Sequence, residues 1–150
     1  MPFFDNPTSP TSGQYAKEAT AWAARIGASD GFIIVTPEYN HSYPAVLKNA
    51  LDHIFWEWNR KPVAIVSYGA RSGGARAREQ LLPVVVELGM LPLRSSVAIP
   101  FPSSTVDAQD EAAARTHQAV LHMASNLVLW AEAAKRVQGT VDDPAPATRR

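Results

Sequence analysis

Short apolar runs alternate with amphipathic stretches along most of this chain. The first run covers residues 32–35, Phe-Ile-Ile-Val, and the second covers residues 63–66, Val-Ala-Ile-Val. Neither run alternates with polar residues, which is typical of parallel strands buried on both faces. We therefore expect two interior strands. A third and weaker strand should run from Arg94 to Ile99 and end at Pro100.

Stretches with helical periodicity lie before and after these runs. One begins at Ser42 or Tyr43, tolerates Pro44 in its first turn and continues to Trp58. Another follows the second strand and contains Pro83, which should kink or split it. The apolar stripes that predict four helices are, in chain order, Tyr15, Ala19, Trp22 and Ile26; Leu47, Leu51, Ile54, Phe55 and Trp58; Leu81, Val85 and Leu88; and Val120, Met123, Leu127, Trp130 and Ala134.

Residues with capping preferences indicate where these helices begin and end. Thr11 and Gln14 have the spacing of a capping box before the first helix. Gly89 is a candidate C-terminal cap of the third helix. Asp107 or Asp110 should open the last helix, because aspartate favours the first turn.

The two ends of the chain lack a period. Residues 1–13 are rich in proline and short polar side chains, so they predict an irregular lead-in on which Phe3 and Phe4 could dock against the body. Residues 140–150 have nothing to bury, and we expect a disordered tail. Residues 1–139 then form one domain.

Strands that alternate with helices require parallel pairing and crossover connections, which predicts a doubly wound three-layer α/β/α fold. With 150 residues, 46% of them hydrophobic, the chain is long enough to bury a core. Lysine and arginine total 14, as do aspartate and glutamate, so the net charge gives no support to a nucleic-acid or anionic-membrane partner. The absence of cysteine excludes thiolate chemistry and disulfides.

No apolar run approaches the roughly 20 residues that span a bilayer, and the first residues do not form a secretory signal. We therefore expect a soluble cytoplasmic protein. His117 and His122 do not share a helix face, and no carboxylate is placed to complete a site, so we expect no metal. Ser72 lacks the Gly-x-Ser-x-Gly context of a serine hydrolase.

Polar loops follow the first two strands, at residues 37–43 and 67–76. Because the carboxyl ends of parallel strands meet at one edge of the sheet, these loops should form two walls of one cleft. The first offers Tyr39 and Tyr43 as flat apolar surfaces and Asn40 as a hydrogen-bonding group. The second contains three glycines, Gly69, Gly73 and Gly74, which let backbone amides approach a ligand. The sequence predicts a site for a planar ring.

Less specific roles for the same residues are also open. The second loop matches neither G-x-G-x-x-G nor the P-loop, so its glycines alone are a weak signal. Taken singly, Tyr39, His41 and Tyr43 more often serve loop packing than ligand contact. Glu38 is most simply interpreted as a solvated carboxylate at the start of a loop that leads into a helix. Arg71 and Arg76 are divided between a cofactor edge and a solvated surface.

Residues 36–52, Thr-Pro-Glu-Tyr-Asn-His-Ser-Tyr-Pro-Ala-Val-Leu-Lys-Asn-Ala-Leu-Asp, are followed by a strand and by Ser67-Tyr-Gly-x-x-x-Gly-Gly-Ala-Arg76. This pattern resembles the NADPH-dependent FMN reductase family of flavodoxin-like proteins. The resemblance implies that both loops contact the flavin, and that the chemistry takes place on the cofactor rather than on a catalytic side chain. The implied cofactor-binding residues are Pro37, Glu38, Tyr39, Asn40, Ser67, Tyr68, Gly69, Gly73 and Gly74.

The resemblance also implies an activity. NADPH or NADH would reduce bound FMN, which passes electrons to a small-molecule acceptor such as a quinone, azo dye, metal oxyanion or free flavin. It further implies a homodimer or homotetramer.

Members of this family begin with a strand and a Ser/Arg/Asn-rich loop that wraps the FMN phosphate, and this sequence has no counterpart. We therefore expect an N-terminally truncated sheet with an exposed edge on its first strand. Arg71 and Arg76 are then candidates to contact the phosphate in place of that loop. The alternative function is a non-catalytic flavodoxin-like remnant that binds a partner or its own copy through that edge.

Overall fold

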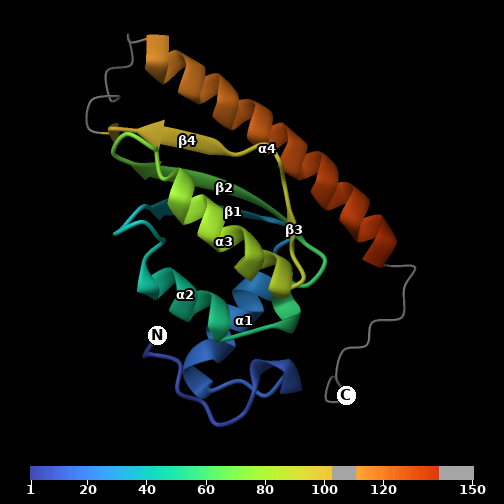
Figure 1. Cartoon of the computed structure of the whole chain (residues 1–150). Coiled ribbons are helices and arrows are strands. Elements are labelled where there is room, and N and C mark those ends of the chain that lie inside the picture. The colour runs from blue at the N-terminus through green and yellow to red at the C-terminus, as the bar shows by residue number, and fades with distance from the viewer. Residues whose placement is uncertain (103–110, 139–150) are drawn as a thin grey trace.

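The computed structural model describes residues 1–102 and 111–138 (Figure 1). Its elements, in chain order, are the 3₁₀ turn η1 (Pro10–Ser12), α1 (Lys17–Gly27), β1 (Phe32–Pro37), α2 (Ala45–Asp52), the 3₁₀ turn η2 (Trp56–Trp58), β2 (Pro62–Gly69), α3 (Ala75–Glu87), β3 (Leu91–Pro92), β4 (Val97–Pro100) and α4 (Glu111–Gln138). The prediction of alternating strands and helices is therefore confirmed.

The strands form a parallel sheet with β2 at its centre. β1 pairs with one edge of β2 from Phe32 opposite Val63 to Pro37 opposite Tyr68. On the other edge, β3 pairs with the start of β2 and β4 with its end. Because all pairings are parallel, β1, β2 and β4 end at the same side of the sheet, toward which the arrow of β4 points in Figure 1.

Helices cover the two faces of the sheet unequally. α1, α2 and α3 lie on one face, and α4 crosses the other (Figure 1). Ile34, Val63 and Ile65 pack into a large cluster with the first three helices. Ala64, Val66, Val97 and Met123 form a smaller cluster under α4. This three-layer arrangement is the α/β architecture that the sequence predicts.

β2 is buried along its first six residues, as predicted for an interior strand. β1 differs, because its burial alternates. Ile34 is 9% exposed, whereas Ile33 and Val35, on the opposite face, are 45% and 62% exposed. The prediction that β1 is covered on both faces is therefore wrong for the part of the chain that the structure describes. α4 packs over β2 and β4 and leaves that face of β1 open.

The helix after β1 is shorter than its apolar stripe suggested. α2 ends at Asp52, and Trp56–Trp58 form a separate 3₁₀ turn. Pro44 is its N-cap rather than a first-turn residue. Trp58 donates from Nε1 to the Leu51 carbonyl oxygen at 3.2 Å, so its side chain folds back onto the end of the helix. Ile54 and Trp58 are still buried in the core. Their apolar side chains therefore continue the helical spacing in the sequence although the helix itself has ended.

Of the two predictions about helix ends, one is wrong and one is confirmed. The capping box does not form: α1 starts at Lys17, and its N-cap Ala16 makes no side-chain hydrogen bond. Of the two effects predicted for Pro83, a split does not occur, because α3 runs as one helix from Ala75 to Glu87, and a kink stays a prediction. Gly89 does terminate α3, because it adopts φ 72° and its amide donates to the Val86 carbonyl oxygen.

The remaining segments agree with the sequence only in part. In the lead-in, Phe4 packs edge-on against His53, whereas Phe3 stays 78% exposed. On α4, Met123 and Ala134 are buried, but Trp130 is 52% exposed. The predicted start of α4 at Asp107 or Asp110 and the predicted tail at 140–150 lie outside the described residues. Within the described part, no helix is long and apolar enough to cross a membrane.

Candidate functional site

Three segments meet where the parallel strands end. The amide of Glu38, one residue beyond β1, donates to the Tyr68 carbonyl oxygen at 2.9 Å. The amide of Phe101, one residue beyond β4, donates to the Gly69 carbonyl oxygen at 2.7 Å. The predicted neighbours, the loops after β1 and β2, therefore lie side by side, and the end of β4 joins them.

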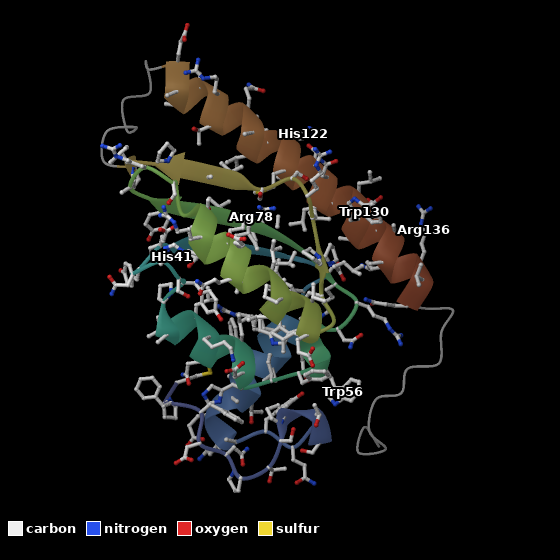
Figure 2. All side chains as sticks on the ribbon, in the orientation of Figure 1. His41, Trp56, Arg78, His122, Trp130 and Arg136 are labelled. Carbon is white, nitrogen blue, oxygen red and sulfur yellow. The ribbon has the colours of Figure 1, made fainter. Side chains whose placement is uncertain are left out.

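The loop after β1 turns back on itself at Asn40 and His41. Tyr39 and Ser42 exchange backbone hydrogen bonds of 2.7 and 3.0 Å. Asn40 and His41 both have positive φ, 48° and 75°, as in a type I′ turn, where asparagine is favoured. Gln80 of α3 donates to the His41 carbonyl oxygen at 2.8 Å. Figure 2 shows His41 on this loop. The hydrogen bond from Gln80 therefore fixes the turn to α3.

The loop after β2 is packed against the sheet. The hydroxyl of Ser67, which is fully buried, donates to the Gly73 carbonyl oxygen at 3.0 Å. Gly73 and Gly74 both have positive φ. A Cβ on Gly74 would lie 2.7 Å from the Ser67 Cβ and from the Tyr68 amide nitrogen, and one on Gly73 would lie 3.1 Å from the amide nitrogen of Ile99. These glycines thus allow the loop to pack closely against β2 and β4, and their contact with a ligand stays a prediction.

Glu38 joins the two loops through its side chain. Its Oε2 accepts from the Ser72 hydroxyl at 3.0 Å and from the Arg76 amide at 3.1 Å, and its Oε1 accepts from Arg76 Nη1 at 2.9 Å. The Glu38 side chain is 11% exposed. The interpretation of Glu38 as a solvated carboxylate is therefore wrong.

Electrostatics agree with this geometry. The hydrogen bond from Arg76 lowers the pKa of the Glu38 carboxyl group below its usual value, and the hydrogen bond from Ser72 acts in the same direction. Partial desolvation opposes both effects without reversing them. Glu38 therefore stays ionised at neutral pH, and Arg76 is paired with it.

The side chains next to Glu38 face outward. Tyr39 is 62% exposed, and Asn40 is exposed too. Among the residues that the structure describes, neither side chain has a hydrogen-bond partner. An exposed aromatic ring beside an unpaired amide can contact a planar ligand that carries hydrogen-bonding groups at its edge.

Tyr43 differs from Tyr39. It packs, partly buried, against the large core cluster, and this burial raises the pKa of its hydroxyl. Its ring also borders a groove of about 450 Å³ that includes Phe4 and Lys48. Tyr43 therefore serves packing more than the cleft, which is the structural role that the sequence analysis left open for it.

Three residues without a predicted binding role also reach this region. Ser72 and Gln80 contact the loop after β1 from 34 and 39 residues away, and Phe101, 50% exposed with φ 46°, lies beside Gly69. Ser72 lies in the loop that was predicted to face the first one, and the predicted end of a third strand at Pro100 would bring the next residue to the same edge, but no local pattern points to Gln80.

The predicted cofactor-binding residues thus lie together at one edge of the sheet. Glu38, Tyr39 and Asn40 come from the first loop, and Ser67, Tyr68, Gly69, Gly73 and Gly74 from the second. Pro37 pairs with Tyr68 at the base. Their role in binding a cofactor stays a prediction.

Comparisons with known proteins identify relatives. The family model for NADPH-dependent FMN reductase matches residues 1–103. An NAD(P)H-dependent FMN reductase of Schizosaccharomyces pombe is 48% identical over 99 residues, which cover 64% of this chain and 48% of that protein. An NAD(P)H-dependent FMN reductase of Nectria sp. is 36% identical over 144 residues, covering 91% of this chain and 67% of that protein.

A solved structure agrees in fold. The flavoenzyme NAD(P)H:(acceptor) oxidoreductase from Paracoccus denitrificans superimposes with a TM-score of 0.65 at 20% identity, over 91% of this chain and 76% of its own. The fold is therefore that of the flavodoxin-like reductases. The chain spans about half the length of the Schizosaccharomyces relative. Because the family model covers more than half of the sequence, this chain belongs to the NADPH-dependent FMN reductase family.

Proposed function

We propose that this chain binds FMN between the loops after β1 and β2 and acts as a flavin-dependent NAD(P)H oxidoreductase. The observation that carries the proposal is the joining of these loops at one sheet edge by Glu38, in a chain of the FMN reductase family. The carboxyl edge of a parallel sheet is where ligands bind in open α/β folds.

The residues present fit a flavin ring in chemical terms. Tyr39 offers an exposed aromatic surface, and Asn40 offers an unpaired amide that both donates and accepts hydrogen bonds. Residues 69–74 lie beside this first loop, which the Ser72–Glu38 hydrogen bond joins to them. When bound, FMN would supply the redox chemistry, taking a hydride from NADPH or NADH and passing electrons to an acceptor.

The protein's own part is to bind and orient. We propose Pro37, Glu38, Tyr39, Asn40, Ser67, Tyr68, Gly69, Gly73 and Gly74 as the cofactor-binding set, with Glu38 acting through the loops rather than on the ring. We propose a small-molecule acceptor of the quinone, azo, metal-oxyanion or flavin class, and a homodimer or homotetramer in the cytoplasm.

A direct experiment tests this function. Purified chain is titrated with FMN while flavin fluorescence is recorded, and the complex is then mixed anaerobically with NADPH. We expect saturable quenching, followed by bleaching of the yellow flavin absorbance and its return on addition of a quinone. A chain that neither quenches FMN fluorescence nor speeds its reduction would contradict the proposal.

A second candidate function rests on the open face of β1. Ile33 and Val35 are apolar and 45% and 62% exposed, and β1 is an edge strand that pairs only with β2 among the described strands, so this side of the sheet is available for self-association or for a partner. In this case the chain is a binding module. FMN titration separates the two, because a binding module has weak or no affinity for flavin, whereas self-association is expected in either case.

A further inference from the structure

Glu38 supplies the side-chain acceptor that the N-cap residue of α3 lacks. Arg76 is the second residue of α3, and its amide is one of the N-terminal donors that have no partner within a helix. The N-cap is Gly74, which has no side chain to accept from it. Glu38, 38 residues earlier in the chain, supplies the missing acceptor at 3.1 Å. A carboxylate here is also favoured by the helix dipole.

The Glu38 carboxylate accepts hydrogen bonds from both Ser72 and Arg76. Ser72 precedes α3, and Arg76 contributes both its amide and its guanidinium. At 48% exposure, the Arg76 side chain lies over the more buried Glu38. One anionic group therefore accepts three hydrogen bonds, and charge-assisted bonds of this kind are about twice as strong as neutral ones.

Both partners of the Glu38–Ser72 contact are adjacent in sequence to residues of the proposed flavin site. Glu38 directly precedes Tyr39 and Asn40, and Ser72 directly precedes Gly73. Beneath it the packing is close, since a Cβ on Gly69 would lie 3.3 Å from the Glu38 Cβ. A change in the Glu38 contacts therefore shifts the loop after β1 relative to the loop after β2.

We propose that Glu38 is a positioning residue for the flavin site: it holds the loops after β1 and β2 at the separation that a flat ring requires. The inference rests on the proposed function. It also argues against Arg76 as a phosphate contact, because Glu38 already neutralises this side chain and takes the anion position at the start of α3. A phosphate placed there would meet like charge.

The test compares Glu38→Gln with Glu79→Gln. Glu79 is exposed on the same helix and makes no hydrogen bond among the described residues, so both variants lose one negative charge near α3. FMN affinity is measured by fluorescence quenching. We expect Glu38→Gln to weaken binding about tenfold or more, and Glu79→Gln to change it less than about twofold.

A second readout follows the contact without flavin. In the unliganded chain, the NMR signal of the Arg76 amide should move as Glu38 titrates below its ordinary pKa, and this movement should vanish in Glu38→Gln but persist in Glu79→Gln. Arg76 is the charged group that faces Glu38, and Ser72 is its neutral donor. A merely structural loss of stability would not remove this pH response selectively.

Ser72→Ala covers the case in which Glu38→Gln does not fold, because it removes one donor and leaves the ion pair. We expect it to weaken FMN binding about threefold. If wild type binds FMN and neither variant weakens it, the positioning role is wrong while the proposed function stands. If wild type does not bind FMN, the proposed function fails, and the positioning role fails with it. If the pH-dependent shift of the Arg76 amide signal is the same in Glu38→Gln as in wild type, the contact between Glu38 and Arg76 is absent in solution.

Discussion

The Ser67 hydroxyl and the Gly73 carbonyl oxygen, six residues apart, form a buried hydrogen bond of 3.0 Å between the end of β2 and the loop that follows it. Both residues are buried, so water cannot replace the lost donor when the hydroxyl is removed. We expect Ser67→Ala to lower the free energy of unfolding by about 2 kcal/mol, because it leaves a buried carbonyl oxygen unpaired.

Urea denaturation measures this change. Ser125→Ala is the control, since its hydroxyl bonds the Leu121 carbonyl oxygen at 3.0 Å on an exposed stretch of α4. The control should stay within about 0.5 kcal/mol of wild type. Equal losses in the two variants would mean that burial of the Ser67 bond has no special effect on stability.

Gly74 should tolerate no side chain. It has φ 82°, and an added Cβ would lie 2.7 Å from both the Ser67 Cβ and the Tyr68 amide nitrogen. We expect Gly74→Ala to reduce the free energy of unfolding by at least about 2 kcal/mol, since strain and overlap add. Gly27→Ala is the matched control, because its Cβ would make only an ordinary 3.6 Å contact with Glu57. Denaturant unfolding should find the control unchanged or stabilised by about 0.5 kcal/mol.

Asn40 offers a cleaner test of the cleft than a bulky residue at Gly73, which would collide with β4. Asn40→Gly keeps the positive φ of 48° and removes only the amide. We expect FMN affinity to fall about threefold to tenfold, the effect of one lost hydrogen bond. His41→Gly loosens the same turn, and its own φ is 75°. If both variants lose affinity equally, turn flexibility explains the loss and the Asn40 amide is not a ligand contact.

The order of elements could be predicted because each leaves a local pattern. The apolar run of β2 and the helical stripe of α3 need no knowledge of the rest of the molecule. The open face of β1 could not be predicted in this way. Val35 is as apolar as its register partner Val66, and only the path of α4 decides that Val66 is covered and Val35 is not.

The site, too, could be predicted from the sequence only in part. Placing the two loops together required only that parallel strands end at one edge, and the pairing of Pro37 with Tyr68 agrees. The partners of Glu38 lie 34 and 38 residues away, with no periodicity linking them, so the sequence suggested solvent instead. The predicted end of α2 was wrong for a related reason. A 3₁₀ turn buries Trp58 in the same core cluster that a continued helix would reach.

Neighbouring isoleucines on β1 test its one-sided burial. Ile34 packs in the large cluster at 9% exposure, and Ile33 is 45% exposed. We expect Ile34→Ala to cost about 3 kcal/mol of unfolding free energy, and Ile33→Ala less than about 1 kcal/mol. Thermal and urea unfolding of the two variants give the comparison. Similar costs would mean that both faces of β1 are covered in solution, through association or otherwise.

The hydrogen bond from Tyr15 to Glu57 should make stability fall at high pH. The hydroxyl of Tyr15 lies 2.6 Å from Glu57 Oε2. Burial, with this bond next in importance, raises the pKa of Tyr15 from 10.0 to about 12. Since the folded pKa lies above the unfolded value, the contribution is fully present below pH 10 and is lost as the pH rises from 10 toward 12.

Tyr15→Phe removes this dependence. At neutral pH the variant should lose about 1 kcal/mol of unfolding free energy, less than is usual for a bond to a charged group because both side chains are partly exposed. Between pH 10 and 12 its stability should fall less steeply than that of wild type. Urea unfolding across this range, with tyrosinate absorbance followed in parallel, measures both effects. Parallel curves for the two proteins would mean that Tyr15 ionises as freely in the folded chain as in the unfolded one.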